Sequence, residues 1–424
     1  MSASEVQRGS SVRDGAPITN PGLANAANAR SSASSAGAAG YAGGRVLRPS
    51  AKSLPEHARG RNRSLVLQTL YRSGTLSRAD LARATGLTRV TISDLVADLL
   101  AENLVVEVGQ RDESRPGKPA TMLDINRGGF QIIGIDLSDY AVFRGAVLDL
   151  DGVVLQRAEV PLDGAVGVDA SAKVVALAER LVGAASLPLL GIGVGSPGVV
   201  DLAGTVLSAP NLGWPSGGSS GEPLQATLAA ATGLPVIVAN DANAAALAEH
   251  SFGAALSDMM LVKVGHGVGA GLIIGGTALV GSRFAAGEIG HVVVGTDGGA
   301  ACACGKHGCL ETWLATPRLD AALAATDDGP DGAAERTAIL RRAGERLGIA
   351  LAPVVGALDL AEVVLSGPVE LLDGPLAEAA IETLRMRTMA EFHGDLSLRM
   401  TALGQDIVMR GAAAMVLSGQ LGVS

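Results

Sequence analysis

The chain has 424 residues, of which 48% are hydrophobic and only 2% aromatic, and its net charge is −9. This length suits two or three domains. No run of about 18 apolar residues is present, which excludes an ordinary membrane-spanning helix, and the N-terminus lacks the basic start and apolar stretch of a secretory signal. We therefore expect a cytoplasmic protein with no membrane partner.

Charge is distributed unevenly along the chain. Residues 44–120 contain 13 lysines and arginines against 8 acidic residues, a net charge of +5. Residues 121–424 contain 17 against 32, a net charge of −15. A basic segment on an acidic body suits a polyanionic partner bound at one end. Chance variation of surface charge is the alternative, and a net charge of +5 does not exclude it.

The first 60 residues predict no compact structure. Residues 1–44 are rich in Ser, Ala, Gly and Asn and lack apolar periodicity, so we expect a disordered tail. Residues 45–60 contain Pro49 and Pro55 and are expected to form a linker.

Residues 61–123 predict a winged helix-turn-helix domain. A first helix with apolar residues from Leu65 to Leu70 ends at Gly74. Ser77 is placed to cap a second helix and Thr88 a third. Two short strands, 104–108 and 120–123, then enclose a basic loop.

Such a domain presents the first turn of its third helix to the major groove of DNA. Arginine there reaches guanine or phosphate, and hydroxyl side chains bond bases or backbone. The proline-flanked loop suits the DNA backbone or a minor groove. A protein-interaction module is the alternative, because winged folds also serve that role. The expected DNA-binding residues are Thr88, Arg89, Thr91, Ser93, Arg115 and Lys118.

From residue 124 the pattern changes to alternating strands and helices, which predicts α/β architecture. Residues 317–424 are expected to be mainly helical, with one strand at 362–365. The other expected strands are 132–135, 146–150, 153–155, 189–194, 235–238 and 259–264, and the other expected helices are 169–184, 223–232 and 241–250.

Asp241 follows a buried strand directly, within the sequence Asn240-Asp241-Ala242-Asn243. In open α/β sheets, ligands bind in the crevice beyond the carboxyl ends of the strands. A carboxylate there is suited to accept a proton from a sugar hydroxyl. The alternative is that Asp241 is a plain helix N-cap, and the two roles are compatible.

All three cysteines lie within eight residues, at Cys302, Cys304 and Cys309. Three thiolates and one imidazole suit tetrahedral zinc. His291, in the sequence Gly287-Glu288-Ile289-Gly290-His291, is one candidate for the imidazole, and His307 competes with it. Three free thiols are the weaker alternative, because the cluster contains every cysteine of the chain.

These motifs together resemble the ROK family (repressor, open reading frame, kinase). The resemblance rests on Gly-Glu-Ile-Gly-His and on Cys-x-Cys-Gly-x-x-Gly-Cys-Leu-Glu, and it extends from about Arg61 to the C-terminus. It implies an actin/hexokinase-like (ribonuclease H-like) duplicated two-lobe fold for residues 124–424, preceded by the winged helix-turn-helix at 61–123. The second lobe would start near residue 244, and a C-terminal helix would return to the first lobe.

The resemblance also implies residue roles. Asp241 matches the position of the general base in the kinases. A structural zinc ion would be held by His291, Cys302, Cys304 and Cys309. The expected sugar-binding residues are Asn240, Asp241, Glu288, His291 and Glu311, with Gly198 and Asn211 in neighbouring segments.

The phosphate-binding loops depart from the family pattern. Kinases of the family open the first lobe with Asp-x-Gly-Gly-Thr, whereas this chain has Asp136-Leu137-Ser138-Asp139-Tyr140. The glycines that admit phosphate are absent, and Asp139 is expected to repel a nucleotide by about 4 kcal/mol at ~4 Å and an effective dielectric near 20. The second loop, 265–271, keeps its glycines but has His266 in place of the usual threonine.

We therefore expect a sugar-responsive transcription regulator that acts as a repressor and has a sugar pocket, no catalytic residue and no bound ATP. Its partners would be operator DNA and a sugar effector, and it would act as a homodimer or homotetramer that sugar releases from DNA. The alternative is an active ATP-dependent sugar kinase that carries a DNA-binding domain.

Overall fold

The structure is a computed structural model that describes residues 55–110, 120–214, 221–295, 299–389, 391 and 395–422. The expected tail (1–44), the linker up to residue 54 and most of the basic loop lie outside the described residues. No helix in the part described is both long enough and apolar enough to cross a bilayer.

The N-terminal unit is a winged helix, as expected. Ser77 and Asp80 form a reciprocal capping box at the start of α2, and Gly86 ends that helix in the left-handed conformation, at φ 71°. Thr88 caps α3. The elements are α1 (Pro55–Ser73), β1 (Leu76–Ser77), α2 (Arg78–Thr85), α3 (Arg89–Ala101), β2 (Val105–Gln110) and β3 (Thr121–Ile125), with sheet order β1-β3-β2.

The first helix begins earlier than the sequence predicts. It starts at Pro55, so residues 55–60 belong to α1 and not to the linker. Proline is well tolerated at the first position of a helix, because its fixed φ is helical and its missing N–H would have no partner there.

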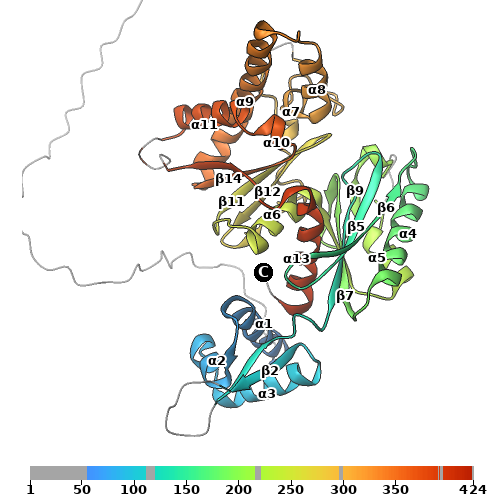
Figure 1. Ribbon diagram of the computed structural model, residues 1–424, viewed down its shortest axis with the longest axis vertical. Helices are drawn as coiled ribbons and strands as arrows, with labels where there is room; N and C mark the ends of the chain where they lie inside the picture. The colour runs from blue at the N-terminus through green and yellow to red at the C-terminus, as the bar shows by residue number, and fades with distance from the viewer. Residues whose placement is uncertain are drawn as a thin grey trace, which may run out of the picture. The chain divides into compact units, whose positions relative to one another are not determined.

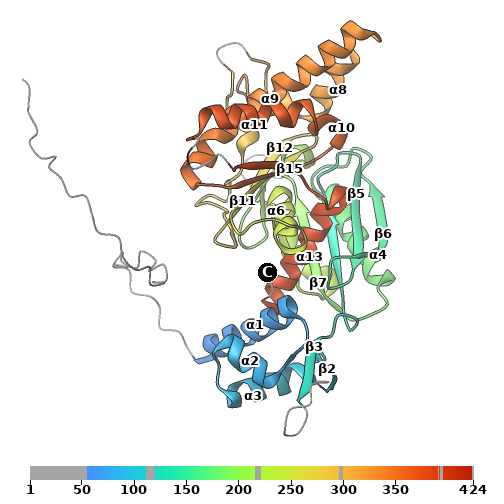
Figure 2. The same ribbon diagram turned by 60° about the vertical axis from the view of Figure 1, so that its left-hand side comes forward.

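The first lobe is built on a five-stranded sheet of order β10-β7-β4-β5-β6, in which β10, β7 and β4 are parallel. Helices α4 and α5 cover one face, and the C-terminal helix α13 packs on β4 and β7 (Figure 1, Figure 2). The elements are β4 (Gln131–Asp136), β5 (Val142–Leu148), β6 (Val154–Pro161), α4 (Val168–Ala184), β7 (Leu189–Ser196), α5 (Leu224–Thr232), β10 (Val236–Asn240) and α13 (Ile407–Leu421).

The second lobe has a five-stranded sheet of order β13-β12-β11-β14-β15, with helices α9 and α11 packed together beside it (Figure 2). Helix α6 packs on β11 and β12 of this sheet and also on α13. The elements are α6 (Asp241–Phe252), β11 (Met259–Val264), β12 (Val268–Ile274), β13 (Thr277–Ala278), α7 (Glu311–Leu314), α8 (Thr316–Ala324), α9 (Pro330–Leu358), β14 (Glu362–Ser366), α10 (Val369–Leu372), α11 (Pro375–Arg387) and β15 (Ser397–Met400).

Two strands of the second lobe differ from the sequence interpretation. The segment 268–271, expected to be part of a phosphate-binding loop, lies in strand β12. Strand β15 lies in a region expected to be helical apart from 362–365. It has four residues, one of them Arg399, so its apolar signal is too short for periodicity to reveal.

The winged helix shares its core with the first lobe. Val66, Leu67 and Leu70 of α1 belong to the same buried cluster as Val416 and Leu417 of α13. The Tyr71 hydroxyl donates to the carbonyl oxygen of Leu150 at 2.7 Å. The DNA-reading unit is therefore packed against the body of the protein.

A buried ion network ties α6 to the second sheet. Arg399 on β15 donates to Glu249 on α6 at 2.8 Å and to Glu362 on β14 at 2.7 Å. The side chains of Glu249 and Glu362 are 1% and 6% exposed. Thr401 also donates to Glu249, at 2.6 Å. Each carboxylate is thus compensated within the protein interior.

Replacing Arg399 tests this network. We expect Arg399→Gln to lower the free energy of unfolding by about 3 kcal/mol, because two buried carboxylates lose their counter-charge. Urea denaturation measures the change. The control is Arg336→Gln, whose ion pair with Asp328 lies in solvent and should cost less than about 1 kcal/mol. Equal losses in the two variants would contradict the assignment.

Candidate ligand cleft, metal centre and DNA-binding face

A cavity of about 480 Å³ lies where the ends of β7, β10 and β11 meet the polar segments around residues 288–311. It falls within the size range of small-molecule sites. All seven residues expected to bind sugar line it. Its polar lining includes Ser138, Tyr140, Ser208, Asn211, Asn240, Asp241, Lys263, His266, Glu288, His291, Cys304 and Glu311, with the backbone of Gly198.

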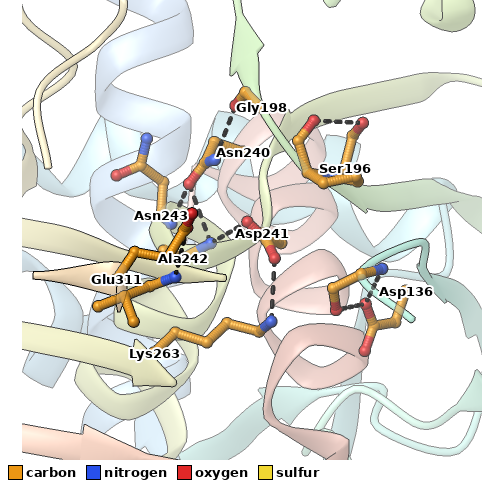
Figure 3. Close-up of polar contacts among 12 residues, drawn as sticks. Asp136, Ser196, Gly198, Asn240, Asp241, Ala242, Asn243, Lys263 and Glu311 are labelled. Carbon is orange, nitrogen blue, oxygen red and sulfur yellow. Dashed lines mark hydrogen bonds and ion pairs between the residues drawn. The ribbon is translucent and has the colours of Figure 1, made fainter. Parts of the chain in front are cut away.

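Asn240, not Asp241, caps helix α6. Its side-chain oxygen accepts from the backbone N–H groups of Ala242 at 2.9 Å and Asn243 at 3.1 Å. Its amide nitrogen donates to the carbonyl oxygen of Gly198 at 2.8 Å (Figure 3). These bonds leave Asn240 one free N–H, so its first role is to hold the Gly198 loop against the start of α6.

Asp241 lines the cavity. One of its carboxylate oxygens accepts from the N–H of Ala242 at 2.9 Å, and the other meets Lys263. The Lys263 ammonium lies 3.0 Å from one carboxylate oxygen of Asp241 (Figure 3), and the two side chains are 19% and 14% exposed. Burial disfavours the charged form of Lys263, but Asp241, Asp136 and Asp139 outweigh it and raise the pKa of this ammonium. Burial in turn raises the pKa of Asp136, against the influence of Lys263 and Ser138.

Aromatic rings occupy the side of the cavity where the phosphate loops were expected. The rings of Tyr140 and His266 lie 4.1 Å apart between centroids, tilted by 46°. Asp139, which was expected to repel a nucleotide, has a counter-charge of its own. Asp139 is absent from the cavity lining and pairs with Arg144 at 2.9 Å. Although burial opposes it, the N–H of Ala141 and the Arg144 guanidinium lower the pKa of Asp139.

Gly267 lies next to the carboxylate of Glu311. A side chain at residue 267 would meet a Glu311 carboxylate oxygen at 2.9 Å. The same oxygen accepts from the N–H of Val268 at 3.3 Å. The glycine-rich segment therefore positions an acidic group of the cavity, which is a reason for glycine that involves no nucleotide.

Glu288 and His291 form the wall of the cavity next to the cysteines. Their facing atoms, Oε2 and Nε2, lie 4.0 Å apart. Burial raises the pKa of Glu288, and the nearby charges of Asp241 and Glu311 add to this while His291 opposes it. The wall offers carboxylate and imidazole groups, which are suited to hydroxyl ligands.

The other ring nitrogen of His291 faces the cysteines. Nδ1 lies 3.6 Å from the sulfur of Cys302, and the sulfurs of Cys304 and Cys309 are also 3.6 Å apart. The four ligand atoms all lie within 4.8 Å of one another, in a set that does not include His307. Tetrahedral zinc with bonds of about 2.0–2.3 Å needs ligand atoms about 3.5–4 Å apart, so the residues present fit this ion.

The third helix of the winged domain presents its first turn to solvent. The Thr88 hydroxyl accepts from the N–H of Thr91 at 3.2 Å and lies 2.9 Å from the Thr91 hydroxyl, so part of the hydrogen-bonding capacity of both side chains is used in the cap. Arg89 and Ser93 are exposed. The expected contacts from Arg115 and Lys118 lie outside the described residues.

Most other arginines of this domain are neutralised within it. The ion pairs join Arg59 to Asp98, Arg63 to Glu102, Arg78 to Glu107 and Arg83 to Asp80. No ion pair joins Arg89 to a residue that the structure describes. Its guanidinium is therefore one that DNA can engage without breaking an internal contact.

Sequence reasoning missed Lys263 and Tyr140. Lys263 is the one charged residue in strand β11, whose sequence is Met-Met-Leu-Val-Lys-Val. A charge near the carboxyl end of an otherwise apolar strand was a usable signal, because that end faces the ligand crevice. Tyr140 gave no such signal, since its contact with His266 joins segments far apart in the chain.

Comparison with known proteins matches both parts of the chain. The model described as ROK family covers residues 132–418, and the model described as MarR family covers residues 60–115. The chain is 30% identical over 401 residues to the xylose repressor of Caldicellulosiruptor bescii, covering 85% of this chain and 96% of that protein. It is 39% identical over 188 residues to the glucokinase of Halalkalibacterium halodurans, which covers 55% of that enzyme.

A relative from Caldicellulosiruptor sp. (strain Rt8B.4) is 33% identical over 264 residues, and the chain spans 64% of its length. Among solved structures, a ROK family transcriptional regulator homologous to the E. coli MLC protein matches with a TM-score of 0.75 and 25% identity, over 87% of this chain and 98% of that one. A ROK family glucokinase from Streptomyces griseus, in complex with glucose and AMPPNP, matches with a TM-score of 0.56 and 27% identity over 67% of this chain.

These matches confirm the actin/hexokinase-like fold and the N-terminal winged helix. Because the family model spans most of the chain and a relative is 30% identical across nearly its whole length, this chain belongs to the ROK family.

Proposed function

We propose that this protein is a sugar-responsive transcriptional repressor, whose winged helix binds operator DNA and whose cleft binds a carbohydrate effector. The full-length similarity to a xylose repressor and to a ROK transcriptional regulator supports this function. The exposed first turn of α3 supplies the DNA-binding face. A homodimer or homotetramer with two-fold symmetry would suit a palindromic operator.

The Lys263–Asp241 ion pair is the observation that favours a sensor over a kinase. A kinase base at residue 241 needs a carboxylate oxygen that is available to a sugar hydroxyl. Here one oxygen of Asp241 lies 3.0 Å from the Lys263 ammonium and the other accepts from the N–H of Ala242 at 2.9 Å. Phosphoryl transfer also needs donors and metal ions around the phosphates. The rings of Tyr140 and His266, which contact each other at a tilt of 46°, occupy the corresponding side of the cavity.

An active sugar kinase remains the second candidate function. The similarity to glucokinases, one of them solved with glucose and AMPPNP, favours it. A kinase would convert ATP to ADP in the presence of its sugar and a sensor would not, so a measurement of ATP turnover distinguishes the two functions.

In the proposed sensor, Asp241, Glu288, His291 and Glu311 bond the sugar hydroxyls, with Asn211 and the Gly198 loop at the opposite side. Asn240 acts chiefly by fixing that loop. Zinc held by His291, Cys302, Cys304 and Cys309 would fix the imidazole ring so that Nε2 points into the cavity. Such coordination sets which nitrogen carries the proton and keeps the ring from rotating.

Helix α6 is the proposed connection between sugar and DNA. It begins at Asp241 in the cleft. It ends at Phe252, which lines a second cavity together with Tyr71 of α1 and Leu417 of α13. Closure of the two lobes around a bound sugar would move α6 and alter how the DNA-reading unit packs against the body of the protein. A sugar changes the affinity for operator DNA only to the extent that it binds the open and the closed arrangement of the lobes with different affinities. We propose that it favours the arrangement that releases the DNA.

We expect a sugar to stabilise the protein without being phosphorylated. A thermal-shift screen of hexoses, pentoses and N-acetyl sugars should find a ligand that raises the unfolding midpoint of the wild type. Asp241→Asn and Glu311→Gln should abolish the shift, whereas Glu345→Gln on the exposed face of α9 should retain it. With Mg-ATP and the same sugar, a coupled assay should show no sustained ADP formation, and sustained turnover would establish the kinase instead.

We expect one zinc ion per chain by elemental analysis. Cys304→Ser should lose the ion and weaken the sugar-induced thermal shift, because His291 is no longer held in place. His307→Ala is the matched control and should retain both zinc and the shift. Loss of zinc in the His307 variant would show that this imidazole, and not that of His291, completes the site.

We expect Arg89→Ala to weaken binding to an operator selected from random duplexes by about tenfold or more, as for loss of a guanine or phosphate contact. Arg336→Ala, outside the winged domain, is the control. Wild-type affinity should fall steeply as salt rises, because phosphate contacts release counterions. Unchanged binding by the Arg89 variant would contradict the placement of the recognition helix.

A further inference from the structure

The exposed face of α3 is chemically unusual for a surface that meets DNA. Ile92, Leu95, Val96 and Leu99 are buried in the domain. The opposite face consists of six exposed residues at helical spacing, which are Arg89, Val90, Ser93, Asp94, Ala97 and Ala101. Two of these side chains, Val90 and Asp94, have no evident purpose within the folded domain.

Val90 exposes 71% of its surface, although it lies in the first turn of the helix. A β-branched side chain in a helix has essentially one χ1 rotamer, so its two methyl groups are held in place before any partner arrives. Burying them costs little side-chain entropy and gains about 0.8 kcal/mol for each carbon group removed from water. In the major groove, the 5-methyl group of thymine is the apolar partner of matching size.

Asp94 is the exception among the acidic residues of this domain. The other four between residues 58 and 110 are Asp80, Asp98, Glu102 and Glu107, and each pairs with an arginine. No ion pair joins Asp94 to a described residue. An unpaired carboxylate on this face is repelled by phosphates, unless it accepts a hydrogen bond from a base amino group. Aspartate accepts in this way from N4 of cytosine.

Val90 and Asp94 are neighbours on one face, because they are four residues apart in a helix. Side chains at this spacing are about 5–6 Å apart at Cβ, and successive bases rise by about 3.4 Å. The two side chains would therefore reach bases one or two steps apart in the same groove.

We propose that Val90 and Asp94 determine the operator sequence, with Val90 contacting the methyl group of a thymine and Asp94 accepting from the amino group of a cytosine one or two steps away. The inference rests on the proposed DNA-binding function and adds two base contacts to it. Arg89 supplies affinity on the same turn. Asp94 supplies discrimination, because its charge penalises every duplex that offers no amino group at that place.

The test begins with selection of duplexes from a random library by the full-length wild-type protein. In the selected operator, each thymine is then replaced in turn by deoxyuridine, which removes only the 5-methyl group. One replacement per half-site should weaken wild-type binding about fourfold, the factor expected for one buried methyl group. Val90→Ala should bind thymine and deoxyuridine at that position equally. Val108→Ala, at the domain's other exposed valine (52%) and outside α3, should keep the wild-type sensitivity.

The same library tests Asp94. Asp94→Asn should exchange the preference for cytosine at one position for adenine, which asparagine recognises, and should bind non-specific duplex more tightly. Asp98→Asn removes the same charge from α3 but from the residue that pairs with Arg59, and it should select the wild-type sequence.

The outcomes distinguish operator binding itself from the assignment of its base contacts to Val90 and Asp94. If the wild type enriches no sequence, operator binding itself fails and the inference falls with it. If the wild type enriches a sequence and both α3 variants select that same sequence with unchanged sensitivity to deoxyuridine, DNA binding stands and the assignment of Val90 and Asp94 is overturned.

Discussion

The contact between helices α6 and α13 is the constraint on which the rest of the structure depends. Small residues allow it: a methyl group at Gly411 of α13 would collide with the carbonyl oxygen of Ala244 on α6. Through this contact α13 packs on the first sheet while α6 packs on the second. Because α6 starts at the cleft and α13 reaches the core of the winged helix, these two helices form a continuous packed connection between the cleft and the DNA-reading unit.

Charge compensation decides what the cleft can do. The carboxylates of Asp136, Asp241, Glu288 and Glu311 would repel one another, but the Lys263 ammonium pairs with Asp241 and its charge also acts on Asp136. The other two carboxylates remain beside His291 as hydrogen-bond acceptors. In a cleft arranged in this way Glu288 and Glu311 can accept from hydroxyl groups, whereas both carboxylate oxygens of Asp241 already have partners in the chain, and this is the physical basis for proposing a sensor.

Local signals predicted the winged helix and the order of strands and helices. The caps Ser77 and Thr88 and the glycine turn at Gly86 act through neighbouring residues, so the sequence contains everything they need. The clustering of cysteines predicted a metal site, and the ligand atoms do lie together. The position of Asp241 after a strand likewise predicted its place in the cavity, because strand ends converge at one edge of the sheet.

The sequence by itself thus determined most element types, the family and seven of the residues that line the cleft. Only the tertiary structure decided which of those residues are free to act. It paired Lys263 with Asp241 and left Val90 exposed. The physical reason is that charge pairing and exposure depend on distances between segments that are remote in the chain, whereas periodicity and capping depend on neighbours within a few residues.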